Sequence, residues 1–196
     1  MPYQPDRLIL ASSSPRRREL LDRGGYRFEV IVPNDSAEED VDTSGMSPER
    51  MVVELARRKA LDVADRIEGA AVMLGCDTVA ECDGEILGKP TDREHARAML
   101  TALSGRRHRV ISGICLCAMP SGEIKATYAE TTLVMNTLTD EQFEAYLNSG
   151  QWEGKAGAFG YQDGIDWITI EHGSESNVVG LPMELLAMML RKVRKG

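Results

Sequence analysis

The segment LILASSSPRRREL, Leu8–Leu20, predicts a buried strand, a small-residue turn and the start of a helix in immediate succession. Its apolar residues indicate a short strand that ends near Ala11. Pro15 suits the first turn of a helix, where no backbone hydrogen bond is lost, and the serine before it can cap free amides. We expect the helix to end near Arg23, before two glycines.

Three consecutive arginines, Arg16, Arg17 and Arg18, open this helix, although the 196-residue chain has a formal net charge of -8. A helix N-terminus already carries partial positive charge, so arginines there are unfavourable unless an anion lies nearby. Free amides and forked guanidinium groups together make a site that suits phosphate. The alternative is a capped surface helix whose arginines face water, and spacing alone does not separate the two interpretations.

Outward from this segment, strand and helix patterns alternate without repeats or a linker. Further strands are expected over 26–32, 70–82, 85–90, 109–119, 125–136 and 164–173. Further helices are expected to begin at Pro48, at capping boxes formed by Thr91 with Glu94 and by Thr139 with Gln142, and at Pro182. Turn signals at 83–84 and 120–122 indicate antiparallel hairpins. The pattern therefore predicts an α/β fold with a mixed sheet, as one continuous domain over 1–196.

The composition is that of an ordinary globular protein, with 42% hydrophobic and 28% charged residues. Its acidic balance argues against a nucleic-acid partner, because binding to a phosphate backbone needs a basic face. No apolar run reaches the length of a membrane span, and the N-terminus lacks a secretory pattern, so we expect a cytoplasmic protein with no membrane partner. The four cysteines lack zinc-ligand spacing and are expected to be reduced.

Asp77 stands inside the mostly apolar strand 70–82. An unpaired buried carboxylate is costly, so this position favours a metal, a cation or a proton-transfer role. The alternative is a carboxylate at a strand end that bonds local amides. Lys89 follows the hairpin and could return near Asp77 across the two strands.

Two further stretches could bind a ligand. The segment KAGAFGYQDG, residues 155–164, combines small residues with a lysine, and its Gln162 offers the donor and acceptor that recognition of a base requires. The alternative is a flexible glycine loop. An acidic stretch that contains Glu38 and Glu39 could supply oxygen ligands for magnesium, although most such stretches are solvated loops.

Taken together, these segments resemble the Maf family of nucleoside triphosphate pyrophosphatases. The matching motifs are SSSPRRRELL at 12–21, DTVA at 77–80 with GEILGKP at 84–90, LSG at 103–105 with HRVISG at 108–113, KAGAFGYQ at 155–162 and NVVGLP at 177–182. They cover nearly the whole chain in order, and five ordered motifs are far more specific than any one of them.

The resemblance implies two lobes around a long mixed β-sheet flanked by helices, with the active site in a central cleft. It implies cleavage of a nucleoside triphosphate to the monophosphate and pyrophosphate, dependent on Mg²⁺ or Mn²⁺, often in a homodimer. By position, Asp77 becomes the proton acceptor and a metal ligand, joined by Glu38 or Glu39. The implied phosphate-binding residues are Ser12, Arg16, Arg17, Lys59, Lys89 and Lys155.

Three positions that differ within the family indicate the substrate. Arg16, Thr78 and Gln162 match the type that acts on dTTP and UTP, whereas the 7-methyl-GTP type tends to have Trp, Gln and Glu there. At 160–163 the chain has GYQD where the dTTP/UTP type usually has GIQG, so we expect Asp163 to add charge and bulk beside the base. The alternatives are a 7-methyl-GTP or broad-specificity enzyme, and a non-catalytic nucleotide-binding regulator of cell division.

Overall fold

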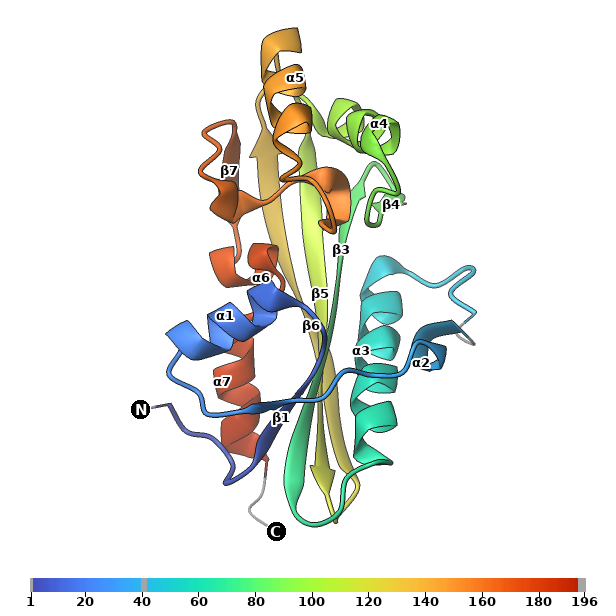
Figure 1. The fold of residues 1–196 in the computed structure, drawn as a ribbon, viewed down its shortest axis with the longest axis vertical. Coiled ribbons are helices and arrows are strands. Elements are labelled where there is room, and N and C mark those ends of the chain that lie inside the picture. The colour runs from blue at the N-terminus through green and yellow to red at the C-terminus, as the bar shows by residue number, and fades with distance from the viewer. Residues whose placement is uncertain (1, 40–41, 194–196) are drawn as a thin grey trace. The chain divides into compact units, whose positions relative to one another are not determined.

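The computed structural model describes residues 2–39 and 42–193, which form an α/β fold (Figure 1). The strands are β1 Leu8–Ala11, β2 Glu29–Val30, β3 Ala71–Cys82, β4 Glu85–Leu87, β5 Arg107–Met119, β6 Glu123–Met135 and β7 Ile168–His172. The helices are α1 Pro15–Arg23, α2 Ser36–Glu39, α3 Pro48–Ala64, α4 Arg93–Leu103, α5 Asp140–Ser149, α6 Glu175–Val179 and α7 Met183–Lys192, with short 3-10 turns η1 Ala156–Ala158 and η2 Tyr161–Asp163.

The strands form one mixed sheet of seven strands, in the order β2-β1-β3-β5-β6-β7, with β4 paired to β3. β1 runs parallel to β2 and β3, and Ala11 at the end of β1 lies opposite Gly75. β4 and β7 are antiparallel to β3 and β6, respectively. The prediction of a mixed sheet flanked by helices is therefore confirmed.

The chain forms two compact units, and β3, β5 and β6 contribute residues to both. The first unit comprises Met1–Asp77, Ser112–Ala129 and Gly180–Gly196, and the second comprises Thr78–Ile111 and Glu130–Val179. The expectation that residues 1–196 form a single domain stays a prediction.

In the first unit, β1 is buried on both faces because helices cover each side of it. Leu8 and Leu10 face a cluster that includes residues of α1 and α7, whereas Ile9 and Ala11 face a cluster built largely from α3. Figure 1 shows α1 and α7 on one side of β1 and α3 on the other. This two-sided burial explains why β1 reads as an uninterrupted apolar run instead of an alternating one.

Two glycines allow α3 to pack directly against the backbone of the sheet. A Cβ atom added at Gly75 on β3 would come 2.0 Å from the carbonyl oxygen of Ala56, and one added at Gly113 on β5 would come 2.1 Å from that of Val52. Any side chain at either position would force the helix away. The close approach brings the side chains that follow Ala56 on α3 within reach of the part of β3 that follows Gly75.

The second unit has its own apolar core, which supports the 155–164 segment. Phe159 and Trp167 are buried in it together with residues of α4 and α5. Tyr146 on α5 packs edge-on against Trp167, with ring centroids 5.4 Å apart, and His108 packs edge-on against Phe159 at 5.3 Å. The contact with His108 packs the segment against the core, and the contact between Tyr146 and Trp167 orders the core beside it.

The structure confirms most of the predicted elements and corrects two. Thr139 and Gln142 form the expected capping box of α5, and β3 and β4 pair across the predicted turn at 83–84. The strand predicted over 26–32 is wrong in extent, because only Glu29 and Val30 pair with β1 at the edge of the sheet. The predicted box at Thr91 is also wrong: the cap of α4 is Asp92, whose carboxylate accepts from the His95 amide at 2.8 Å.

No helix within residues 2–39 and 42–193 has the length and apolar character needed to cross a membrane.

Candidate active site

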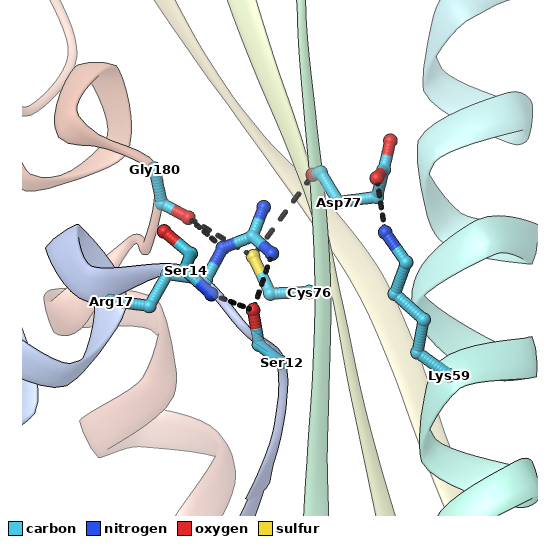
Figure 2. A network of polar contacts seen from close by, with 7 residues as sticks. All are labelled: Ser12, Ser14, Arg17, Lys59, Cys76, Asp77 and Gly180. Carbon is cyan, nitrogen blue, oxygen red and sulfur yellow. Dashed lines mark hydrogen bonds and ion pairs between the residues drawn. The ribbon is translucent and has the colours of Figure 1, made fainter. Parts of the chain in front are cut away.

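Lys59 and Asp77 form an ion pair in the first unit. The Lys59 ammonium donates to Oδ1 of Asp77 at 2.6 Å, and the two side chains are 11% and 14% exposed. Lys59 comes from α3, which the glycine contacts hold against the sheet, and Asp77 lies on β3 two residues beyond Gly75. Figure 2 shows the second carboxylate oxygen of Asp77 pointing away from Lys59. The pair therefore fixes the carboxylate while leaving one oxygen turned outward from the contact.

A second set of contacts holds Arg17 where β1 meets α1. Its Nε donates to the Gly180 carbonyl at 2.9 Å, and its Nη1 donates to the Ser12 hydroxyl at 3.1 Å. The Ser12 hydroxyl also accepts from the Ser14 amide at 3.2 Å. Ser14 precedes α1, but its side chain makes no capping hydrogen bond, so the predicted side-chain cap is wrong. Arg17 and Ser12 are 9% and 4% exposed. Two acceptors on different elements therefore fix the orientation of the guanidinium group.

Cys76 links this set to β3, because its thiol donates to the same Gly180 carbonyl at 3.3 Å. Figure 2 shows Cys76 and Asp77 pointing to opposite sides of β3, one toward Arg17 and the other toward Lys59. Cys76 and the Gly180 carbonyl are contacts that the sequence interpretation missed. The NVVGLP motif at 177–182 was the available signal, and it was open to a packing explanation.

The parallel pairing of β1 and β3 explains why these residues meet. Ala11 lies opposite Gly75, so Ser12 directly follows the last paired residue of β1, and Asp77 lies two residues beyond Gly75, on the part of β3 that extends past the end of β1. Ligand sites in α/β proteins lie at the carboxyl ends of such strands. Arg16 is half-buried in the first turn of α1, and Thr78 is half-buried directly after Asp77.

The second unit holds the other predicted residues, Lys89, Lys155 and Gln162. The side chains of Lys89 and Gln162 are exposed. The Gly157 amide donates to the Gly88 carbonyl at 3.0 Å, so the segment that carries Lys155 is tied to the residue before Lys89. The expectation that Lys89 returns near Asp77 stays a prediction.

Lys155 is not solvated, because it forms an ion pair with Asp163. The two side chains are 10% and 8% exposed, and the Tyr146 hydroxyl also donates to Oδ2 of Asp163 at 2.8 Å. The Asp163 carboxylate is therefore paired inside the protein, and the expectation that it adds charge and bulk beside the base stays a prediction. No pattern in the sequence indicated Tyr146 as a partner of Asp163.

A divalent metal would be held in this protein by side chains of His, Cys, Asp or Glu. Among the side chains that the structure describes, no three His, Cys, Asp or Glu residues form a group that could hold a metal ion. The side chains of Glu38 and Glu39 lie outside the described part of the chain. Mg²⁺ commonly binds through one or two carboxylates together with phosphate oxygens of the substrate. The single carboxylate of Asp77 fits a metal that is held jointly with a triphosphate.

The fold and this arrangement define a class of mixed-sheet α/β proteins with basic side chains and a carboxylate gathered near the carboxyl end of a parallel strand, β1. Residues 7–193 match the family model described as Maf-like protein. The chain therefore belongs to the Maf family, as its motifs indicated.

Two relatives agree with this membership, and one solved structure shares the fold. The chain is 52% identical to the dTTP/UTP pyrophosphatase of Rhodopirellula baltica, over 95% of this chain and 82% of that protein. It is 43% identical to the dTTP/UTP pyrophosphatase of Ruminiclostridium cellulolyticum, over 96% of both chains. The Ham1 protein of Staphylococcus aureus has a similar fold, with a TM-score of 0.51 at 14% identity over 95% of this chain and 99% of that one.

Proposed function

We propose that this protein is a nucleoside triphosphate pyrophosphatase that hydrolyses dTTP and UTP to the monophosphate and pyrophosphate. Its relatives in Rhodopirellula baltica and Ruminiclostridium cellulolyticum bear that activity in their names. The observation that carries the proposal is the Asp77 carboxylate, held at 2.6 Å by Lys59 on β3 just beyond the end of the neighbouring strand β1. Such a carboxylate can accept a proton, and the basic groups on α1 and α3 suit a polyanionic substrate.

In this proposal Asp77 orients a water molecule and takes its proton. The water oxygen attacks the α-phosphorus, the bond from that phosphorus to the bridging oxygen breaks, and pyrophosphate leaves. Lys59 keeps the carboxylate in one orientation, so its outward oxygen remains available to the water. Arg17, fixed by Ser12 and Gly180, offers positive charge to the triphosphate. Positioning and charge neutralisation supply most of the acceleration in reactions of this kind.

The proposed cofactor is Mg²⁺ or Mn²⁺, held by Asp77 with Glu38 or Glu39. A divalent ion of this kind neutralises charge on the phosphate oxygens. The other phosphate contacts in the proposal come from Arg16, Lys89 and Lys155.

Base selection is assigned to Arg16, Thr78 and Gln162, whose identities match the dTTP/UTP type.

A homodimer in the cytoplasm completes the proposal. Light scattering of the purified chain tests the oligomeric state, and a monomeric mass at micromolar concentration would contradict it.

The activity is tested by release of pyrophosphate from a panel of dTTP, UTP, CTP, GTP and 7-methyl-GTP, with Mg²⁺, with Mn²⁺ and with a chelator. We expect the highest kcat/KM for dTTP and UTP and a loss of turnover with the chelator. Preference for 7-methyl-GTP would contradict the base assignment. Absence of pyrophosphate from every triphosphate would contradict the enzyme and favour a nucleotide-binding regulator.

A further inference from the structure

The ion pair between Lys155 and Asp163 is nearly closed off from solvent, with side-chain exposures of 10% and 8%. Burying two charges costs about as much as their attraction returns, so an apolar pair of similar volume is often as stable or more stable. The net stability of the pair is therefore a weak reason for its presence. What it supplies is a fixed position for the ammonium group.

Tyr146 completes the arrangement from another element. Its hydroxyl donates to Oδ2 of Asp163 at 2.8 Å and accepts from the Gly160 amide at 3.1 Å. Lys155 donates to the same Oδ2, so one carboxylate oxygen receives both donors. Three points of the 155–164 segment are thereby bound to one another and to α5.

Gly160 lies directly against the charged ends of Lys155 and Asp163. A Cβ atom added at Gly160 would lie 2.6 Å from both the Lys155 ammonium and Oδ2 of Asp163. The packing of Tyr146 against Trp167 also fixes the ring that carries the hydroxyl. The ammonium group is therefore held by a carboxylate that is itself anchored to α5 through Tyr146.

The same contacts hold the backbone at Gln162. Asp163 ends the η2 turn, and its amide donates to the Gly160 carbonyl at 3.0 Å. This hydrogen bond closes the turn that contains Gln162. The Gln162 side chain is exposed, whereas Asp163 next to it is anchored inside. Fixing Asp163 thus fixes the backbone from which the Gln162 side chain projects.

We propose that Asp163 and Tyr146 are positioning residues that hold Lys155 and Gln162 in one arrangement, and so couple triphosphate binding to recognition of the base. This inference rests on the proposed function, which assigns Lys155 to phosphate and Gln162 to the base. Lys155 has three ammonium hydrogens, and the contact with Asp163 uses one of them. The carboxylate therefore aims the ammonium group without using up its capacity to donate.

The test is binding of a non-hydrolysable dTTP analogue, measured by calorimetry on the full chain in the presence of Mg²⁺. Asp163→Asn removes the charge, retains an acceptor for Tyr146, and is expected to raise Kd by about 10-fold, the size of one lost charge-assisted hydrogen bond. Tyr146→Phe removes one neutral hydrogen bond and is expected to raise Kd by about 3-fold. Discrimination between UTP and GTP analogues should narrow by about 3-fold or more in Asp163→Asn.

A double-variant comparison separates positioning from mere structural support. If Asp163 acts through Lys155, the effect of Asp163→Asn on Kd disappears when Lys155→Ala is already present. The matched control is Glu144→Gln. Glu144 lies on α5, as Tyr146 does, and this variant makes the same change of a carboxylate to an amide in an exposed ion pair with Arg93 of α4. We expect the control to bind the analogue as the wild type does.

Each outcome decides the inference. An Asp163→Asn variant that melts at a lower temperature but binds with the wild-type Kd overturns it, as does an effect that persists in the Lys155→Ala background. Binding does not require turnover, so a wild type that binds but releases no pyrophosphate contradicts only the proposed function. A wild type that binds no triphosphate analogue contradicts both.

Discussion

Each unit of the protein contains one lysine–aspartate ion pair of low exposure, yet the surroundings of the two carboxylates differ. Asp77 meets Lys59 through Oδ1, and its other oxygen points away from that contact (Figure 2). Asp163 receives Lys155 and the Tyr146 hydroxyl on a single oxygen, inside the apolar core of its unit. Similar burial therefore accompanies two different roles. A carboxylate held on one side can act on a substrate, whereas one held by two donors organises the protein around it.

The largest expected effect comes from making the same change in both pairs. Asp77→Asn should lower kcat by about 10²–10⁴-fold, the range for loss of a general base, because the amide cannot accept the proton from water. Asp163→Asn, with an identical chemical change, should leave kcat within about 3-fold, because its effect falls on binding. Steady-state kinetics with dTTP gives both values.

A thermal melt of each variant serves as the control for folding. Equal losses of kcat in the two variants would remove the distinction between the pairs. Wild-type kcat in a folded Asp77→Asn variant would remove Asp77 from the chemistry.

Charge removal within the second pair should give the next largest effect, on stability. Lys155→Met leaves the Asp163 carboxylate buried without its counter-ion, which is expected to lower the free energy of unfolding by about 3–5 kcal/mol. Adding Asp163→Asn removes the orphaned charge and retains an acceptor for Tyr146, so at least half of the loss should return. Urea unfolding at pH 7 measures both variants. A double variant no more stable than Lys155→Met would show that the pair's charges are not the source of the loss.

The surroundings of the Lys59–Asp77 pair were more predictable from the sequence than those of the Lys155–Asp163 pair, for a physical reason. The strand–turn–helix over 8–20 and the carboxylate at Asp77 are local patterns, and an apolar run interrupted by one acidic residue can be recognised without knowing its neighbours. The Lys59–Asp77 contact joins positions 18 residues apart, and the family resemblance implied both residues for the site without pairing them.

The contacts that hold these side chains depend on tertiary packing, and so no local pattern indicates them. The thiol of Cys76 and the Gly180 carbonyl are 104 residues apart in sequence. The pairing of Asp163 depends on where α5 places the Tyr146 hydroxyl, so the departure from the family motif at this position did not indicate its buried partners. The strand over 26–32 was overestimated because alternation cannot show that the sheet ends there.

His108 gives the smallest predicted effect. It tests whether the packing around the Lys155–Asp163 pair can be weakened while the surroundings of the Lys59–Asp77 pair stay unchanged. It is 2% exposed, and its ring packs edge-on against Phe159 in the segment that carries the second pair. Burial lowers the pKa of His108 from 6.5 to about 4, against smaller opposing contributions from the Arg106 backbone and the Glu81 charge. Between these values the unfolded chain binds a proton that the folded protein does not. Stability from this residue is therefore complete above pH 6.5 and is lost as pH falls toward 4.

From pH 7 to pH 5 the free energy of unfolding should fall by about 2 kcal/mol through His108. His108→Phe keeps an aromatic ring against Phe159 but cannot titrate, so urea unfolding of this variant should show a pH dependence reduced by that amount. Hydrogen exchange at pH 5 then locates the change, because strain at His108 acts first on the packing of Phe159. Amides of residues 155–164 should exchange faster in the wild type than in the variant, while those around Lys59 exchange alike in both. The same pH dependence in the two proteins, or faster exchange first around Lys59, would contradict the separate behaviour of the two ion pairs.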